Sequence, residues 1–167
     1  MSNAILVRPA VEADYSHIAR ITVDAYMEAG YFPSADHPYM LQIQQVADRA
    51  RTAPILVAER GGEVIGSVTL AVAGDEWADI AREDELEFRM LVVDPAVQRS
   101  GAGKAMVEAI IDRARSLEGV NAVALTTGGH WTSARRLYDK MGFGRMSERD
   151  WPVEGTDIML VVYRLEL

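Results

Sequence analysis

The chain has 167 residues, a length that fits a single domain with a full hydrophobic core, and we predict one domain over residues 1–167. Its hydrophobic content of 49% and charged content of 25% are typical of a globular protein in water. The absence of cysteine excludes a disulfide framework, a thiolate metal site and a cysteine nucleophile. A formal net charge of -8 argues against nucleic acid as a partner.

The sequence also argues against a membrane protein and against a metal site. No apolar run approaches the length of a membrane span, and Arg8 and Glu12 come too early for a signal peptide. We therefore expect a cytoplasmic protein with no membrane partner. The three histidines, His17, His37 and His130, show no metal-ligand spacing, so we expect no metal.

The first half of the chain alternates strand and helix signals. The predicted elements are a strand at 5–9, a helix between 12 and 30, a loop at 30–38, a second helix from 40 to 50, and strands at 55–59 and 64–72. Residues 74–84 are acidic and without a clear period, which predicts a loop or a short irregular helix.

A strand, a glycine-bearing turn and a helix follow one another between residues 85 and 117. Branched and aromatic residues predict a strand at 85–93, which Asp94-Pro95 ends because proline has no N–H for a ladder. Residues 98–103 form a turn with two glycines. An apolar stripe at helical spacing then predicts a helix, with Met106, Ile110, Ala114 and Leu117 on one face.

Such a turn binds anions, because the first turn of a helix has free N–H groups and a partial positive charge. A Walker loop would need glycine at Gln98 and serine or threonine at Ala105, so that interpretation is rejected. A dinucleotide fingerprint would need a third glycine at Met106 and is rejected too. A helix entry with incidental glycines stays open at this point.

The last part of the chain again alternates. The predicted elements are a strand at 123–127, a helix from 132 or 133 to 141, a strand at 144–150, a turn at 151–155 and a final strand at 158–167. Apolar positions in this helix place Tyr138 on its buried side. This order indicates an α/β or α+β fold.

Two separated motifs resemble those of the GNAT superfamily of N-acetyltransferases. Residues 98–103, Gln-Arg-Ser-Gly-Ala-Gly, resemble that family's Gln/Arg-x-x-Gly-x-Gly/Ala loop, and residues 134–143 resemble its helix ending in Leu-Tyr-x-x-x-Gly-Phe. The resemblance implies a central mixed, mostly antiparallel sheet of six or seven strands with helices on both faces. It also implies that the strands around Glu87 and Leu125 splay apart and admit the pantetheine arm of a cofactor.

The resemblance further implies an acetyl-CoA-dependent N-acetyltransferase that moves an acetyl group directly to a primary amine of a small molecule or peptide. Tyr138 corresponds to the family's general acid, although its spacing alone fits a core aromatic residue. Glu87 is the candidate base, on a strand face that we expect it to share with Glu85, Arg89, Leu91 and Val93. Its alternative is a strand carboxylate in an ion pair.

By the same resemblance, acetyl-CoA is the co-substrate and a set of twelve residues binds it. These are Leu91, Val92, Val93, Gln98, Arg99, Ser100, Gly101, Ala102, Gly103, Lys104, Thr127 and Trp131. Trp131 is a departure, because the family often has asparagine at this position to contact the pantetheine arm. Thr126, Thr127 or His130 could take over that contact.

The acceptor amine is expected to meet Tyr31, Phe32, Trp77 and Glu85. Seven carboxylates in the thirteen positions 75–87 would favour cationic or apolar amines over acidic ones, unless they only form a solvated surface. A homodimer is a family-level expectation. The alternatives are a transferase with another acyl donor and a non-catalytic acyl-CoA-binding or sensor domain.

Overall fold

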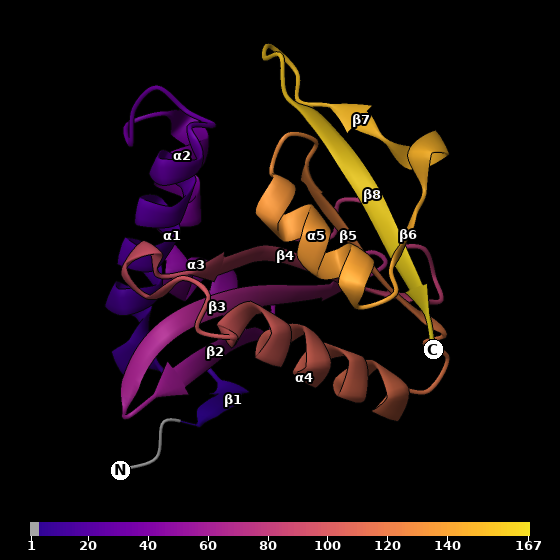
Figure 1. Ribbon diagram of the computed structural model, residues 1–167, viewed down its shortest axis with the longest axis horizontal. Helices are drawn as coiled ribbons and strands as arrows, with labels where there is room; N and C mark the ends of the chain where they lie inside the picture. The colour runs from indigo at the N-terminus through magenta and orange to yellow at the C-terminus, as the bar shows by residue number, and fades with distance from the viewer. Residues whose placement is uncertain (1–3) are drawn as a thin grey trace.

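The computed structural model describes residues 4–167 as one eight-stranded sheet with helices on both faces (Figure 1). The strands are β1 Ile5–Pro9, β2 Ile55–Arg60, β3 Glu63–Val72, β4 Glu85–Val93, β5 Ala122–Gly128, β6 Gly144–Arg145, β7 Trp151–Pro152 and β8 Met159–Glu166. The helices are α1 Tyr15–Ala29, α2 Pro38–Ile43, α3 Val46–Ala50, α4 Ala102–Ser116 and α5 Thr132–Lys140, with single 3-10 turns at Glu12–Asp14, Pro95–Val97 and Ser147–Arg149.

The strand order is β1-β2-β3-β4-β5-β8-β6, with β7 also paired to β8. Only the β4–β5 pair is parallel, so the predicted mixed, mostly antiparallel sheet is confirmed. The count is eight rather than six or seven because β6 and β7 are separate strands of two residues each. The strand predicted at 144–150 stops after Arg145, since the chain turns so that Arg149 can reach Glu85 in the interior.

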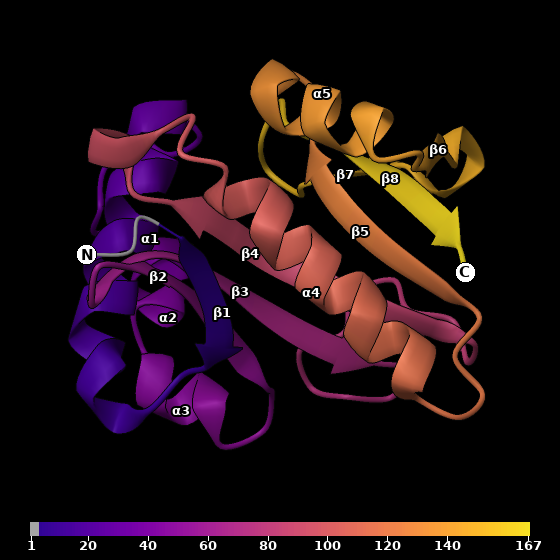
Figure 2. The ribbon, with the colours of Figure 1, turned by 60° about the horizontal axis from the view of Figure 1, so that its bottom comes forward.

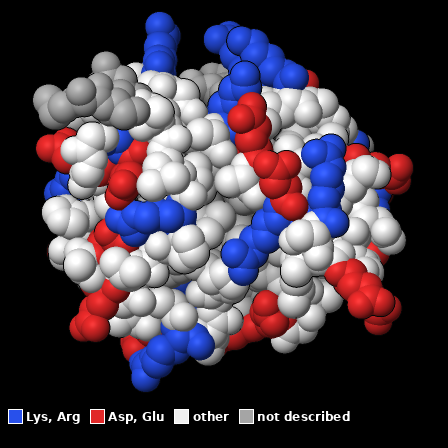
Figure 3. Space-filling view, turned by 90° about the horizontal axis from the view of Figure 1, so that it is seen from below, with Lys and Arg blue, Asp and Glu red and all other residues white. Residues whose placement is uncertain are grey.

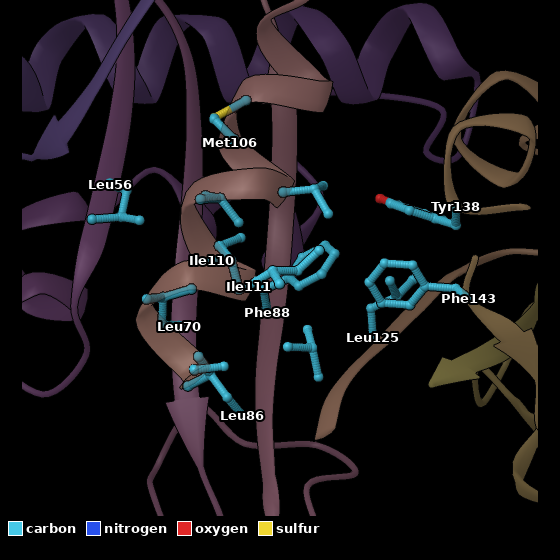
Figure 4. Close-up of a cluster of buried hydrophobic side chains, with 14 of the residues drawn as sticks. Leu56, Leu70, Leu86, Phe88, Met106, Ile110, Ile111, Leu125, Tyr138 and Phe143 are labelled. Atoms are coloured by element: carbon cyan, nitrogen blue, oxygen red, sulfur yellow. The ribbon is translucent and has the colours of Figure 1, made fainter. Parts of the chain in front are cut away.

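Helix α4 lies across one face of the sheet, where it contacts β1 to β5 (Figure 2). The predicted stripe on α4 is confirmed, because Met106, Ile110 and Ala114 are fully buried, while Leu117 beyond the helix is partly exposed. Helix α5 packs against the same apolar cluster, and Figure 4 shows residues from α4, α5 and the sheet meeting there.

Helices α1, α2 and α3 cover the opposite face, in the half of the sheet that contains β3 and β4. The second predicted helix is divided into α2 and α3 near Gln45. Arg49, which is almost fully buried, donates to the carbonyl oxygen of Ile43 at 2.7 Å and so caps the end of α2. Among residues 4–167, no helix is long and apolar enough to cross a membrane.

Candidate active site

The sheet opens where β4 and β5 stop pairing. Their parallel register runs from Glu85 with Ala122 to Phe88 with Leu125 and ends there. The predicted splay around Glu87 and Leu125 is present, and it begins directly after the pair of Phe88 with Leu125. In Figure 1 the half of the sheet with β1 to β4 and the half with β5 and β8 diverge beyond this point.

A bulge in β4 sits at the start of the opening. Met90 has φ 54°, in the left-handed region that side chains rarely adopt, and the β3–β4 register shifts between Ser67 and Thr69. Before the bulge Phe88 faces α4, whereas after it Leu91 faces α4 and Met90 faces α1. One extra residue has therefore reversed the alternation of the strand.

Because of the bulge, Glu87 does not share a strand face with Leu91 and Val93. Glu87 lies opposite Ala71, which packs in the cluster under α1, so Glu87 points to the α1 side. Leu91 and Val93 pack in the other cluster, on the α4 side. The period-two prediction that they share a face with Glu87 is wrong, because it assumed an unbroken strand.

A cavity of about 400 Å³ occupies the opening. Six of the residues predicted for the site line it, namely Tyr31, Phe32, Leu91, Thr127, Trp131 and Tyr138. Its other walls come from β4, β5, α5, the region from α1 to α2, and the β7–β8 hairpin. This volume falls within the range of small-molecule sites.

Tyr138 reaches the cavity from the middle of α5. Its ring packs against Phe88, Phe143 and Tyr163, with ring centroids 5.9 Å away in each case. Burial raises the pKa of its phenol, so the hydroxyl keeps its proton at neutral pH. Figure 4 shows the hydroxyl turned toward α4 and β4, away from the Tyr138 backbone. A neutral phenol in this place can donate a proton to an atom in the cavity.

Glu87 is fully buried beside the cavity and does not line it. One carboxylate oxygen accepts hydrogen bonds from three consecutive backbone N–H groups, those of Asp79, Ile80 and Ala81, at 2.9, 3.0 and 3.0 Å. The other oxygen is buried without a hydrogen-bond partner among the described residues. Burial raises the pKa of Glu87, although the N–H groups of Ile80 and Ala81 act in the opposite direction.

Two charged residues that were not predicted as site residues line the cavity. Asp79 and Arg89 both line the cavity and form an ion pair of 3.0 Å. Arg89 also donates to the Trp77 carbonyl oxygen at 2.9 Å. No local sequence pattern predicts the contact between Asp79 and Arg89, because Asp79 lies in a segment with no regular secondary structure.

Glu85 is fully buried and far from solvent. It accepts two hydrogen bonds from Arg149 and one from Arg164, all at 2.8 Å, and one from the N–H of Arg82. Burial alone would raise its pKa, but the bonds from Arg149 and the Arg82 N–H outweigh this and lower it to about 2. Glu85 does not line the cavity, and its ion pairs with Arg149 and Arg164 indicate that it stabilises the fold.

Trp77 and most of the acidic segment also lie outside the cavity. The Trp77 indole donates to Thr52 and lies between the guanidinium groups of Arg49 and Arg89. Of the seven carboxylates at positions 75–87, only Asp79 lines the cavity. The segment therefore does not form a negative rim around the opening, since Glu85 and Glu87 are buried and Glu76 and Glu83 are exposed outside the cavity lining.

The predicted phosphate loop lies at the start of α4. Gly101 is the N-cap with φ 89° and Arg99 has φ 62°, so the backbone turns sharply before the helix. A Cβ on Gly103 would come within 3.2 Å of the Leu137 side chain, so this glycine lets the first turn of α4 approach α5 closely. The loop therefore lies against α5, the helix that carries Tyr138, although none of residues 98–104 lines the cavity.

Backbone N–H groups supply the anion-binding capacity of this loop. The first N–H groups of α4 have no partner within the helix, and Ser100 accepts the one from Ala102, at 3.3 Å. Lys104 is largely exposed, with Glu108 3.8 Å away. Figure 3 shows basic and acidic side chains intermixed on the face seen from below, so attraction for phosphates would be local to the loop.

The geometry thus defines an α/β protein with a splayed parallel strand pair, a helix N-terminus able to hold an anion, and a buried tyrosine between them. A sequence profile described as "Acetyltransferase (GNAT) family" matches residues 18–143, which is most of the chain. The chain belongs to this family.

Individual relatives agree with this assignment. The chain is 36% identical over 118 residues to a mycothiol acetyltransferase of Sanguibacter keddieii, covering 66% of this chain and 36% of that protein. It is 35% identical over 92 residues to N-acetyltransferase 8 of Homo sapiens, covering 55% of this chain and 39% of that protein. The chain thus spans less than half the length of these relatives.

Solved structures share the fold across the whole chain. The structure of yncA from Salmonella typhimurium with its cofactor acetyl-CoA has a TM-score of 0.74 and 23% identity, covering 99% of this chain and 95% of that one. A ribosomal-protein-alanine N-acetyltransferase from Brucella melitensis has a TM-score of 0.73 and 21% identity, covering 97% and 99%.

Proposed function

We propose that this chain is an N-acetyltransferase that moves the acetyl group of acetyl-CoA directly to a primary amine of a small molecule or peptide. The observation that carries this proposal is a juxtaposition at one opening of the sheet. The parallel pairing ends at Phe88, Tyr138 lines the cavity that follows, and the glycine turn of α4 lies against α5, which carries Tyr138. Family membership supports the same conclusion.

The proposed cofactor site runs from the turn of α4 to the cavity. The N–H groups around Gly101 and Gly103, with Arg99 and Lys104 nearby, would hold the pyrophosphate. Leu91 and Thr127 would border the pantetheine arm between β4 and β5. Acetyl-CoA supplies an activated thioester carbon when it is bound.

Two proton transfers complete the proposed reaction. The amine nitrogen bonds to the thioester carbon, the carbon–sulfur bond breaks, and CoA leaves as the free thiol. Tyr138 would give its proton to the departing sulfur, because its burial keeps it protonated. Glu87 would take the amine's proton through water, since it lies beside the cavity and one of its oxygens has no partner.

An assay of CoA release from acetyl-CoA over a panel of amines tests this function, together with calorimetry of acetyl-CoA binding. Turnover that depends on an amine supports transfer. Binding of acetyl-CoA with no turnover by any amine would instead favour a sensor domain. A higher kcat/KM with another acyl-CoA would favour a different acyl donor on the same site. A homodimer and a cytoplasmic location stay predictions.

A further inference from the structure

Aromatic rings from two separate stretches of the chain line part of the cavity. This aromatic wall consists of Tyr26 in α1, Tyr31 and Phe32 in the following loop, Tyr39 in α2, and Trp131 at the start of α5. The Tyr31 and Trp131 centroids lie 5.1 Å apart in an edge-to-face arrangement, and Tyr26 lies 6.2 Å from Trp131. These contacts fix the rings relative to one another.

The side chain of Tyr31, in the loop after α1, reaches the other half of the sheet. Its hydroxyl lies against Gly128 at the end of β5, where a Cβ would collide with it. Because Gly128 has no side chain, Tyr31 can lie directly against it, and the aromatic wall thereby reaches the end of β5. A larger residue at position 128 would push Tyr31 away, so this contact requires glycine there.

Among the described lining residues, no guanidinium or ammonium group is free to pair with a ligand's carboxylate, because Arg89 is engaged by Asp79 and by the Trp77 carbonyl oxygen. His37 also lines the cavity, and its Nδ1 already accepts the N–H of Tyr39. The two lining carboxylates, Asp79 and Glu154, would repel a carboxylate on the ligand, which would also lose its hydration on entering.

The position of the aromatic wall relative to Tyr138 gives an orientation to the acceptor. Trp131 precedes α5 and Tyr138 follows seven residues later, which places them about 10 Å apart along the helix axis. An amine that reacts near Tyr138 would thus direct its body toward Trp131, where rings line the cavity.

We propose that the acceptor is an amine with an aromatic body and no carboxylate, held by the aromatic wall through Trp131. This assigns Trp131 to acceptor specificity, in place of the cofactor contact expected from the sequence. The inference rests on the proposed acetyl transfer and adds the class of acceptor to it.

Three acceptors that differ in ring and charge test it in the CoA-release assay: 2-phenylethylamine, phenylalanine, which adds a carboxylate, and 1,4-diaminobutane, which has no ring. A thiol reagent can follow the reaction without background from the protein, because the chain has no cysteine. We expect kcat/KM for 2-phenylethylamine to exceed that of each of the others about tenfold or more, since an apolar pocket discriminates single groups by roughly 10–200-fold. Calorimetry of the three amines with the CoA-bound protein gives a readout independent of turnover.

Two variants locate the effect. Trp131→Ala should lower kcat/KM for 2-phenylethylamine about tenfold, mainly through KM, and should narrow its advantage over 1,4-diaminobutane. Trp77→Phe is the matched control, because this tryptophan lies outside the cavity lining, and it should keep the ranking of acceptors.

The outcomes separate this inference from the proposed function. CoA release at equal kcat/KM for all three amines, or a preference for phenylalanine, would overturn the inference and leave acetyl transfer intact. Selective binding of 2-phenylethylamine without CoA release from any amine would show that the aromatic wall binds such amines, but it would overturn the proposed function and with it the assignment of an acceptor. An unchanged ranking in Trp131→Ala would remove Trp131 from acceptor specificity.

Discussion

Replacing Glu85 with glutamine separates a structural role from a role in substrate binding. The substitution keeps the size of the side chain and removes the charge that meets Arg149 and Arg164 in the interior. If Glu85 belonged to the acceptor site, KM for the amine would rise. If it holds the fold together, the free energy of unfolding should fall instead.

The size of the effect follows from the pKa of Glu85. Its pKa falls from 4.5 to about 2 in the folded protein, and this corresponds to about 3 kcal/mol, since one pH unit is worth about 1.4 kcal/mol. Removing one partner of a buried ion pair typically costs about 3–5 kcal/mol, which agrees. For a domain of this size, such a loss lowers the melting temperature by roughly 6–12 °C.

The pH dependence supplies a second measurement. Because the folded pKa lies below the unfolded one, the stabilisation is complete above about pH 5 and is lost as pH falls toward about 2. Urea unfolding of wild type and Glu85→Gln should therefore differ at neutral pH and converge in acid. Glu83→Gln, at an exposed position in the same segment, is the control and should shift stability by less than about 0.5 kcal/mol. Equal midpoints for Glu85→Gln and wild type at pH 7, with a raised KM, would refute the structural role.

Three further predictions concern the proposed reaction. Tyr138→Phe keeps the ring contacts and should lower kcat about 10²–10⁴-fold while the Kd for acetyl-CoA, measured by calorimetry, stays similar; an unchanged kcat would make Tyr138 a packing residue. In Glu87→Gln the amide oxygen can still accept hydrogen bonds from the three N–H groups, so the fold should persist while kcat/KM falls. In the wild type, kcat/KM should fall in acid as Glu87 becomes protonated, at a pH above the ordinary pKa of glutamate. The variant should lack this fall. Gly101→Val places a branched side chain at φ 89° in the proposed phosphate loop and should abolish the rise in melting temperature on adding acetyl-CoA, with circular dichroism confirming a folded protein; an intact rise would place the phosphates elsewhere.

Much of the fold was predictable because its signals are local. The apolar stripe of α4, the buried position of Tyr138 and the turn through Gly101 all follow from residues close in sequence, and the structure has each of them. Helical and strand periodicity depend on neighbours within a few residues. The sequence could therefore predict a strand, an anion-binding turn and a helix without knowing what packs against them.

The site depended on contacts that no local pattern contains. Glu85 pairs with Arg149 and Arg164, which lie 64 and 79 residues further along the chain. The sequence does not show these partners, so it predicted that the Glu85 carboxylate would face the acceptor. The aromatic wall likewise joins Tyr31 to Trp131 across the two halves of the sheet.

The sequence by itself determined the class of fold, the order of its elements and the family motifs around Gly101 and Tyr138. Only the tertiary structure decided which face Glu87 occupies, because the bulge at Met90 adds one residue and reverses the alternation beyond it. It also decided that Glu85 and Glu87 turn inward, since a buried charge must find its partner wherever the fold brings one.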